Sequence, residues 1–434
     1  MTAGAAYRGP RVLSVLLDFP LPANTGLHLR MASVLSALRT ADVDSRVLWF
    51  STADRSVDSV DDGALDELCC GHRHAGQRVE QHELGLALRA ASKLTFAAAP
   101  FVAPMVERIG SRRPFVHPFS MRYDAAGARE RIVEEIERLA ADAVVVPSQG
   151  IHWLSAVPHT VMKIVDAADV LTDVSHRLAS EAAGASAVGL WANHLACRTL
   201  ERRYLPAADE VWVSSAAEAS RVVELAPGSK PLVVPNVVAA PGERTGSDGP
   251  DHPRAVGMIA TWSYKPNLDA ALRLIDEVAP VLHRRTGARL ILAGADLPAD
   301  LRGKCRQSPA VEYMGRVEHL HDFYSAVDAV VMPISVRGGV PLKLAEALAW
   351  GVPIVATSAV VCGLDLQHGR HLLVADSNDE FAESAAVLLA DRQLASHLAE
   401  QGRAAHQSMF SHEALQHAMS SSPVLGRLSA ARVR

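Results

Sequence analysis

Short apolar runs alternate with amphipathic and loop-like segments along most of this chain. In its first half the apolar runs cover residues 12–17, 45–50, 143–147, 161–165, 210–215 and 232–235. In its second half they cover residues 255–260, 289–293, 311–314, 329–334 and 352–356. Such runs are typical of parallel strands buried on both faces, and the helical segments between them complete βαβ units. The pattern therefore predicts an α/β protein with two doubly wound, Rossmann-like domains.

The boundary between the two predicted domains lies in residues 239–253, which are rich in Gly, Pro and charge and lack hydrophobic periodicity. Segments of this kind are typical of interdomain linkers. We therefore expect a first domain over residues 1–238, a second over residues 254–409 and a C-terminal segment over residues 410–434. The end of that segment, near Val433, is expected to be disordered, as chain termini often are.

The segments between the apolar runs predict the intervening helices and loops. Residues 27–39 and 266–285 have the composition of helices, and residues 174–204 predict one long helical region. Residues 61–78 are polar and predict a loop region, with its histidines on the surface.

One strand–loop–helix–strand unit, over residues 328–357, carries the most informative chemistry. Its loop contains Gly338 and Gly339, and its helix is expected to begin at Pro341 and to end before Gly351. Proline favours the first position of a helix, and glycine favours the position after the last. The unpaired N–H groups at a helix N-terminus bind phosphate, and glycine lets the backbone approach the ligand closely.

Two charged side chains on this predicted helix fit a nucleotide diphosphate. Lys343 lies in the first turn, where the helix dipole alone would favour an acid, so a cation there indicates a bound anion. Glu346 follows on the same face and can accept hydrogen bonds from a ribose diol. An ordinary amphipathic helix with two solvated charges has the same spacing, and spacing alone does not decide between them.

Composition narrows the classes of function. The 434 residues are 49% hydrophobic and 21% charged, as in a globular protein with well-formed cores. A net charge of −5 and an aromatic content of 5% argue against a nucleic-acid partner. The chain shows neither a membrane-spanning apolar run nor a signal-peptide core, so we expect a cytoplasmic protein without an integral membrane segment. The five cysteines and the histidines have no metal-site spacing, which predicts reduced thiols and no metal site.

The stretch from Gly338 to Thr357 resembles the donor-site signature of retaining GT-B glycosyltransferases of family four, the glycosyl transferases group 1. The matching donor-site positions are Gly338, Gly339, Val340, Pro341, Leu342, Lys343 and Glu346. The resemblance implies that Lys343 contacts the donor diphosphate and that Glu346 binds the ribose hydroxyls. Many members carry a second Glu, eight residues earlier, that faces the transferred sugar. Gly338 stands at that position here, so the donor sugar must be held differently.

Two further segments of the second domain resemble the same family. In one, Thr261 stands where other branches have a phosphate-binding Arg, which leaves Lys265 as the better phosphate candidate. A solvated loop lysine is the alternative. In the other, Arg316 and Val317 match the segment that usually meets the nucleotide base through backbone groups.

The first domain resembles the family in patches. Gly26 lies in a loop that leads to Arg30 and resembles the glycine loop at the interdomain cleft of these enzymes. A simple turn with a solvated Arg30 is the alternative.

A second patch follows the run at residues 161–165. Many family members place a His–Asp or similar polar pair there, facing the reacting sugar, but Ala168 stands in the position of the His. Asp169 is therefore the catalytic candidate in this domain. Asp166 and Asp169 have an alternative role, which is to cap a helix that begins near Thr172.

The resemblance implies a GT-B fold, with two Rossmann-like domains facing a cleft and residues 410–434 returning to the first domain. It also implies transfer of a sugar, of the hexosyltransferase type, from a nucleotide-diphosphate donor to an unidentified acceptor. Retention, no cofactor and no metal are implied as well, with Lys343 and Lys265 neutralising the leaving diphosphate as Mg²⁺ does elsewhere. A GT-B nucleotide-sugar epimerase and a non-catalytic nucleotide-sugar-binding protein remain as alternatives. The sequence does not indicate the sugar, the base, the acceptor or the oligomeric state.

Overall fold

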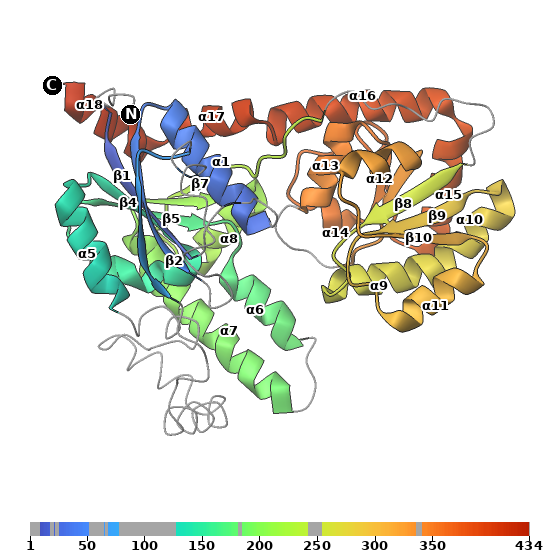
Figure 1. Cartoon of the computed structure of the whole chain (residues 1–434), viewed down its shortest axis with the longest axis horizontal. Helices are drawn as coiled ribbons and strands as arrows, with labels where there is room; N and C mark the ends of the chain where they lie inside the picture. Colours follow the sequence, from blue (N-terminus) through green and yellow to red (C-terminus); the bar gives the residue numbers. More distant parts are fainter. Residues whose placement is uncertain are drawn as a thin grey trace. The chain divides into compact units, whose positions relative to one another are not determined.

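The computed structural model describes residues 9–17, 21, 26–51, 65, 68–77, 127–180, 185–241, 254–335 and 341–433. The chain divides into two compact units (Figure 1). The first comprises Met1–Asn236 and Leu415–Arg434, and the second comprises Val237–Ala414. Most of the predicted linker, residues 242–253, lies outside the described residues.

A parallel sheet forms the centre of the N-terminal unit. Its described strands are β1 (Arg11–Leu16), β2 (Asp44–Ser51), β3 (His72–Gln77), β4 (Ala143–Pro147), β5 (Met162–Ala167), β6 (Glu210–Val213) and β7 (Pro231–Val233). They lie in the order β3-β2-β1-β4-β5-β6-β7. Most residues of β1, β4 and β6 are buried, which is why these strands read as continuous apolar runs.

The helices of this unit agree with the helical segments that the sequence predicts. They are α1 (Gly26–Thr40), α5 (Ala128–Leu139), α6 (Leu171–Ser180), α7 (Ala185–Tyr204), α8 (Ala216–Leu225) and α18 (Pro423–Val433), while α17 (His412–Ser420) crosses the unit boundary. Helices α6 and α7 occupy most of the helical region predicted over residues 174–204, and residues 181–184 lie outside the described residues.

The prediction of a loop over residues 61–78 is wrong at its end, because β3 occupies residues 72–77. This strand pairs in parallel with β2, with His72 opposite Val47. The His74 ring packs on Trp49 with 4.5 Å between the ring centroids. An edge strand has a neighbour on one side only, so it can form from polar residues that carry no apolar signal in the sequence.

A second parallel sheet forms the centre of the C-terminal unit. Its strands are β8 (Ala255–Ile259), β9 (Arg289–Ala293), β10 (Val311–Gly315), β11 (Ala329–Met332), β12 (Ile354–Ala356) and β13 (Leu373–Val374), in the order β10-β9-β8-β11-β12-β13. Its helices are α9 (Lys265–Arg273), α10 (Ala279–Thr286), α11 (Ala299–Gln307), α12 (Leu320–Ala326), α13 (Leu342–Trp350), α14 (Ser358–Val361), α15 (Asn378–Ala390) and α16 (Arg392–Met409). A π-helical segment, Leu274–Val278, joins α9 to α10.

The direction of winding in this second sheet changes between β8 and β11. The chain moves outward from β8 to β9 and β10, and then returns to add β11, β12 and β13 on the other side of β8. Right-handed crossovers therefore place α9 and α11 on one face and α12 and α13 on the other (Figure 1). Ligands of open α/β sheets bind at such a switch point, beyond the carboxyl ends of the strands.

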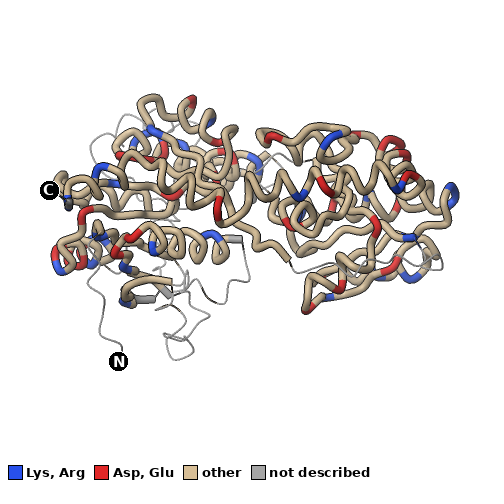
Figure 2. Tube along the Cα trace, turned by 90° about the horizontal axis from the view of Figure 1, so that it is seen from above, with Lys and Arg blue, Asp and Glu red and all other residues tan. Residues whose placement is uncertain are grey.

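Positive and negative residues are distributed along the chain without a strong bias. Lys and Arg positions are interspersed with Asp and Glu positions along the described trace (Figure 2). Among the described helices, none is both long enough and apolar enough to span a bilayer. All five cysteines lie within the described ranges, and no disulfide joins them.

The C-terminal helix α18 is anchored on the N-terminal unit by a buried carboxylate. Glu210 is 2% exposed and accepts hydrogen bonds from the Ser422 hydroxyl at 2.7 Å and from the Val424 N–H at 3.3 Å. Its carboxylate also accepts the indole N–H of Trp212 at 2.6 Å. Because α18 is helical to Val433, the expected disorder near that residue is wrong.

We predict that Ser422→Ala destabilises the N-terminal unit by about 2 kcal/mol. The substitution removes a hydrogen bond to buried Glu210 and the hydroxyl that accepts the Leu425 N–H at 3.1 Å in the first turn of α18. Urea unfolding measures the change, and Ser420→Ala is the matched control because Ser420 is exposed. Equal midpoints for Ser422→Ala and the control would show that this anchor contributes little.

Candidate functional site

Helix α13 begins directly beside the switch point of the second sheet. Pro341 is its N-cap, with φ −68° and ψ 116°, so the helix starts one residue later than predicted. It ends at Gly351, whose φ of +60° is left-handed. The nearest atoms to a Cβ there belong to the flexible guanidinium of Arg403, so it is the left-handed backbone that favours glycine at this position. The predicted loop residues Gly338, Gly339 and Val340 lie outside the described residues.

Lys343 is tied to a buried amide from a different helix. Its ammonium donates a hydrogen bond of 2.5 Å to the Oδ1 of Asn267, which is 6% exposed and lies in the first turn of α9. Burial lowers the pKa of Lys343 to about 8, and the neighbouring Glu346 carboxylate opposes that shift. Lys343 is therefore a half-buried cation whose hydrogen bond, among the described residues, goes to a neutral group.

Glu346 is supported in the same way from α12. Its carboxylate accepts the hydroxyl of Tyr324 at 3.3 Å. Tyr324 is fully buried and stacks on Trp350, with 5.4 Å between the ring centroids. Burial raises the pKa of Glu346, while the Tyr324 hydrogen bond and the charge of Lys343 lower it. The alternative of two solvated charges on a surface helix does not fit this burial.

The other predicted site residues of the C-terminal unit are less closely associated with Lys343 and Glu346. Lys265 is the first residue of α9, and its 60% exposed side chain pairs with Asp269 at 2.6 Å. Arg316 is exposed, and Val317 packs against the core. Both follow β10, and strand β9 separates β10 from β8. Leu342, the first residue of α13, is half-buried.

In the N-terminal unit, Arg30 is a buried residue of α1. It is 3% exposed, and its guanidinium donates two hydrogen bonds to Asp166 Oδ1, at 2.6 and 2.8 Å. It also donates to the backbone carbonyl of Val234 at 2.9 Å and to Asn236 Oδ1 at 3.0 Å. The alternative of a solvated Arg30 is therefore wrong. Gly26 is the first residue of α1.

Asp169 borders a small cavity at the carboxyl ends of β1, β4 and β5. The cavity has a volume of about 60 Å³, and its polar lining includes Ser148, Gln149 and Asp166. Asp169 is exposed as a residue, yet its carboxyl group loses enough hydration against the protein to raise its pKa, while Arg30 acts in the opposite direction. Among the described residues, no group of three or more His, Cys, Asp or Glu side chains could hold a metal ion.

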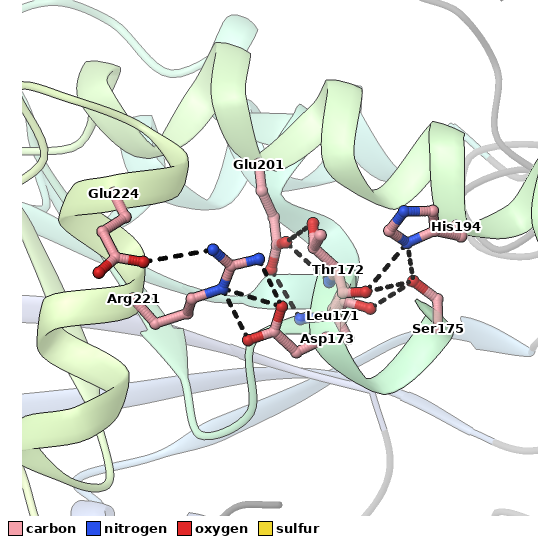
Figure 3. Close-up of polar contacts among 8 residues, drawn as sticks. All are labelled: Leu171, Thr172, Asp173, Ser175, His194, Glu201, Arg221 and Glu224. Carbon is pink, nitrogen blue, oxygen red and sulfur yellow. Dashed lines mark hydrogen bonds and ion pairs between the residues drawn. The ribbon is translucent and has the colours of Figure 1, made fainter. Parts of the chain in front are cut away.

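The N-terminus of α6, which follows Asp166 and Asp169 in the chain, is capped by Glu201 of α7 (Figure 3). One carboxylate oxygen of Glu201 accepts the Leu171 N–H at 2.8 Å, and the other accepts the N–H of Thr172 at 2.9 Å and its hydroxyl. The cap of α6 thus comes from α7, and the capping role considered for Asp166 and Asp169 is wrong. Burial raises the pKa of Glu201 to about 7.

Sequence reasoning did not assign Asn267, Tyr324 or Glu201. The pair Pro266–Asn267 indicates the start of a helix. Nothing in the sequence, however, connects Asn267 to Lys343. Glu201 lies 30 residues from the N–H that it caps. No local signal could have found that contact.

Comparisons with known proteins agree with the fold. Residues 253–391 match the family described as glycosyl transferases group 1. No curated protein sequence matches the chain. Sucrose-phosphate synthase from Thermosynechococcus elongatus has a similar structure, with a TM-score of 0.67, 15% identity, and coverage of 97% of this chain and 100% of that one.

Two other solved structures show the same similarity. Anabaena HepE in complex with UDP has a TM-score of 0.63 and 14% identity, and the match covers 94% of this chain and 98% of that one. A glycosyltransferase from Rickettsia africae has a TM-score of 0.63 and 10% identity, covering 97% and 99%. The predicted GT-B fold is confirmed. The resemblance is confirmed at the level of glycosyl transferases group 1.

We predict that Glu201→Gln changes how stability depends on pH. The folded pKa of about 7 exceeds the ordinary value of 4.5, so the folded state binds more protons between those values. Wild type should therefore lose roughly 3 kcal/mol of unfolding free energy as pH rises from 4.5 to 7 because of this group, and no more above it. Glutamine does not titrate, so the unfolding free energy of the variant should rise relative to that of wild type between pH 4.5 and 7.

Urea unfolding between pH 4.5 and 8 tests this expectation. Glu224→Gln is the control, because the Glu224 carboxylate is exposed and pairs with Arg221. Its unfolding free energy should run parallel to that of wild type. A parallel curve for Glu201→Gln would contradict the prediction.

Proposed function

We propose that this protein is a glycosyltransferase that transfers a sugar from a nucleotide-diphosphate donor to an acceptor, with retention of configuration and without a metal ion or cofactor. The observation that carries the proposal is the pair of half-buried charges on α13, Lys343 and Glu346, beside the switch point of the second sheet. This helix lies within the segment that matches glycosyl transferases group 1. Retention rests on the resemblance of residues 338–357 alone.

The chemistry assigned to Lys343 is electrostatic. Negative charge grows on the diphosphate as the glycosyl bond breaks, and a cation fixed in a site of low polarity stabilises that charge. With its pKa lowered to about 8, Lys343 is mostly protonated at neutral pH. The exposed Lys265 would supply a second cation by exchanging Asp269 for phosphate.

The remaining predicted residues bind the donor or face the reaction. Glu346 accepts the ribose hydroxyls, and the backbone at Arg316 and Val317 meets the base. By the resemblance, Gly338, Gly339 and Val340, with Pro341 and Leu342, are assigned to binding of the donor phosphates and sugar, and Gly26 is assigned to donor binding as well. Asp169, which borders the cavity of that unit, accepts a hydrogen bond from a reacting hydroxyl.

The two alternatives differ in what they do with a bound donor. An epimerase would invert a stereocentre of the donor sugar without passing that sugar to an acceptor, and a binding protein would leave the donor intact. Incubation with labelled nucleotide sugars separates transfer or hydrolysis, epimer formation and simple binding. The expected cytoplasmic location stays a prediction.

We predict that a nucleoside diphosphate stabilises the protein without Mg²⁺. A ligand at about one hundred times its dissociation constant adds about 2.7 kcal/mol to the unfolding free energy. Thermal denaturation with UDP, GDP, ADP and dTDP, each in EDTA and in Mg²⁺, measures the effect. The absence of a shift with all four would remove the donor-site assignment.

We predict that Lys343→Ala and Glu346→Gln reduce activity through different steady-state parameters. Lys343→Ala should lower kcat by about two to three orders of magnitude, because its interaction strengthens in the transition state. Glu346→Gln should mainly raise the donor KM, because the ribose does not change during the reaction. Wild-type values of kcat and KM in both variants would make α13 structural only.

A further inference from the structure

Asn267 is held in one orientation by its own loop. Its backbone N–H donates to the Tyr264 carbonyl at 3.0 Å, and its side-chain Nδ2 donates to the Thr261 carbonyl at 2.9 Å. Because a carbonyl accepts from Nδ2, the other end of the amide, Oδ1, is the acceptor that faces the Lys343 ammonium. The amide orientation therefore follows from its two partners.

The loop that holds Asn267 is itself fixed to the sheet. Trp262 is fully buried, and its backbone N–H donates to the Ala295 carbonyl at 3.1 Å. Asn267 follows β8, whereas Lys343 follows β11. Their hydrogen bond thus crosses the switch point and connects the two halves of the C-terminal unit.

We infer that Asn267 is a positioning residue for diphosphate binding, which holds the Lys343 ammonium towards the ligand through a neutral hydrogen bond. The inference rests on the proposed function of Lys343. An ammonium has three N–H donors, and Asn267 uses one of them. A neutral acceptor fixes the ammonium without cancelling its charge. An aspartate at the same place would pair with Lys343 and repel the incoming phosphate.

The charged groups near Lys343 are bonded to other partners, so we assign the positioning role to Asn267. On the same helix, Glu346 is bonded to Tyr324 of α12. On α9, Lys265 and Asp269 form an ion pair with each other. Arg273, further along α9, bonds to Asn378 and to the Asp376 carbonyl. In the described part of the chain, the Lys343 ammonium donates its hydrogen bond to Asn267.

Diphosphate affinity as a function of pH tests the inference. The best binder among UDP, GDP, ADP and dTDP is titrated calorimetrically into wild type, Asn267→Ala and Asn267→Asp between pH 6 and 10. In wild type, affinity should fall as pH rises through the Lys343 pKa of about 8. Asn267→Ala removes the hydrogen-bond acceptor of the charged Lys343 ammonium, which lowers the pKa of Lys343 further. The fall in affinity should therefore move to lower pH, and affinity at pH 7 should weaken about tenfold.

Asn267→Asp is nearly isosteric with wild type and should move the alkaline fall in diphosphate affinity in the direction opposite to Asn267→Ala. The added carboxylate favours the charged lysine, so the fall in affinity should move to higher pH. Affinity at pH 7 should still weaken about tenfold, because the carboxylate competes with the phosphate. Asn378→Ala is the matched control, since Asn378 bonds to Arg273 and Glu277 and should keep the wild-type profile.

The outcomes separate the inference from the proposed function. Wild-type affinity and an unmoved alkaline fall in both Asn267 variants would overturn the positioning role while leaving the donor site in place. A lower melting temperature with an unmoved fall would make Asn267 merely structural and overturn the role as well. A wild type that binds none of the four diphosphates would overturn both.

Discussion

The half-buried ammonium of Lys343 is the feature on which the proposed site depends. Taking a cation partly out of water is costly, and its lowered pKa expresses that cost. The fold keeps the cation in place through Asn267, which accepts its hydrogen bond but supplies no negative charge. A site built this way is complete only when an anion arrives. This is the reason to associate α13 with a diphosphate rather than with the packing of the unit.

In the N-terminal unit, the buried charges are already bonded to partners within the unit. Arg30 is nearly inaccessible, and its guanidinium is already bonded to Asp166, Asn236 and a backbone carbonyl. The pair fixes α1 to the end of β5. Glu201 fixes the following helix by capping α6 from α7. Asp169 lies between these two anchors, exposed at the end of its strand. A charge held by rigid neighbours but left exposed itself suits contact with a substrate.

The two units share one principle of construction. Each is a parallel sheet that winds outward in both directions from a central pair, β1 with β4 in one and β8 with β11 in the other. The turns that follow these strands carry the cavity in the first unit and the Asn267–Lys343 contact in the second. In both, the chemistry of the site is carried by residues just beyond strand ends, where loops can vary while the sheet stays constant.

The sequence by itself determined most of the strands, the two-sheet architecture and the place of Lys343 and Glu346 on one helix. These features rest on local signals: buried parallel strands are apolar along their whole length, and Pro341 and Gly351 mark the helix ends to within one residue. The edge strand β3 carried no such signal, because polar residues suffice where one neighbour pairs. Only the tertiary structure decided which partners hold the charges. Asn267, Tyr324 and Glu201 act across 76, 22 and 30 residues of sequence. Contacts between elements that far apart depend on how the sheets wind and how the helices between the strands pack, which no local pattern records.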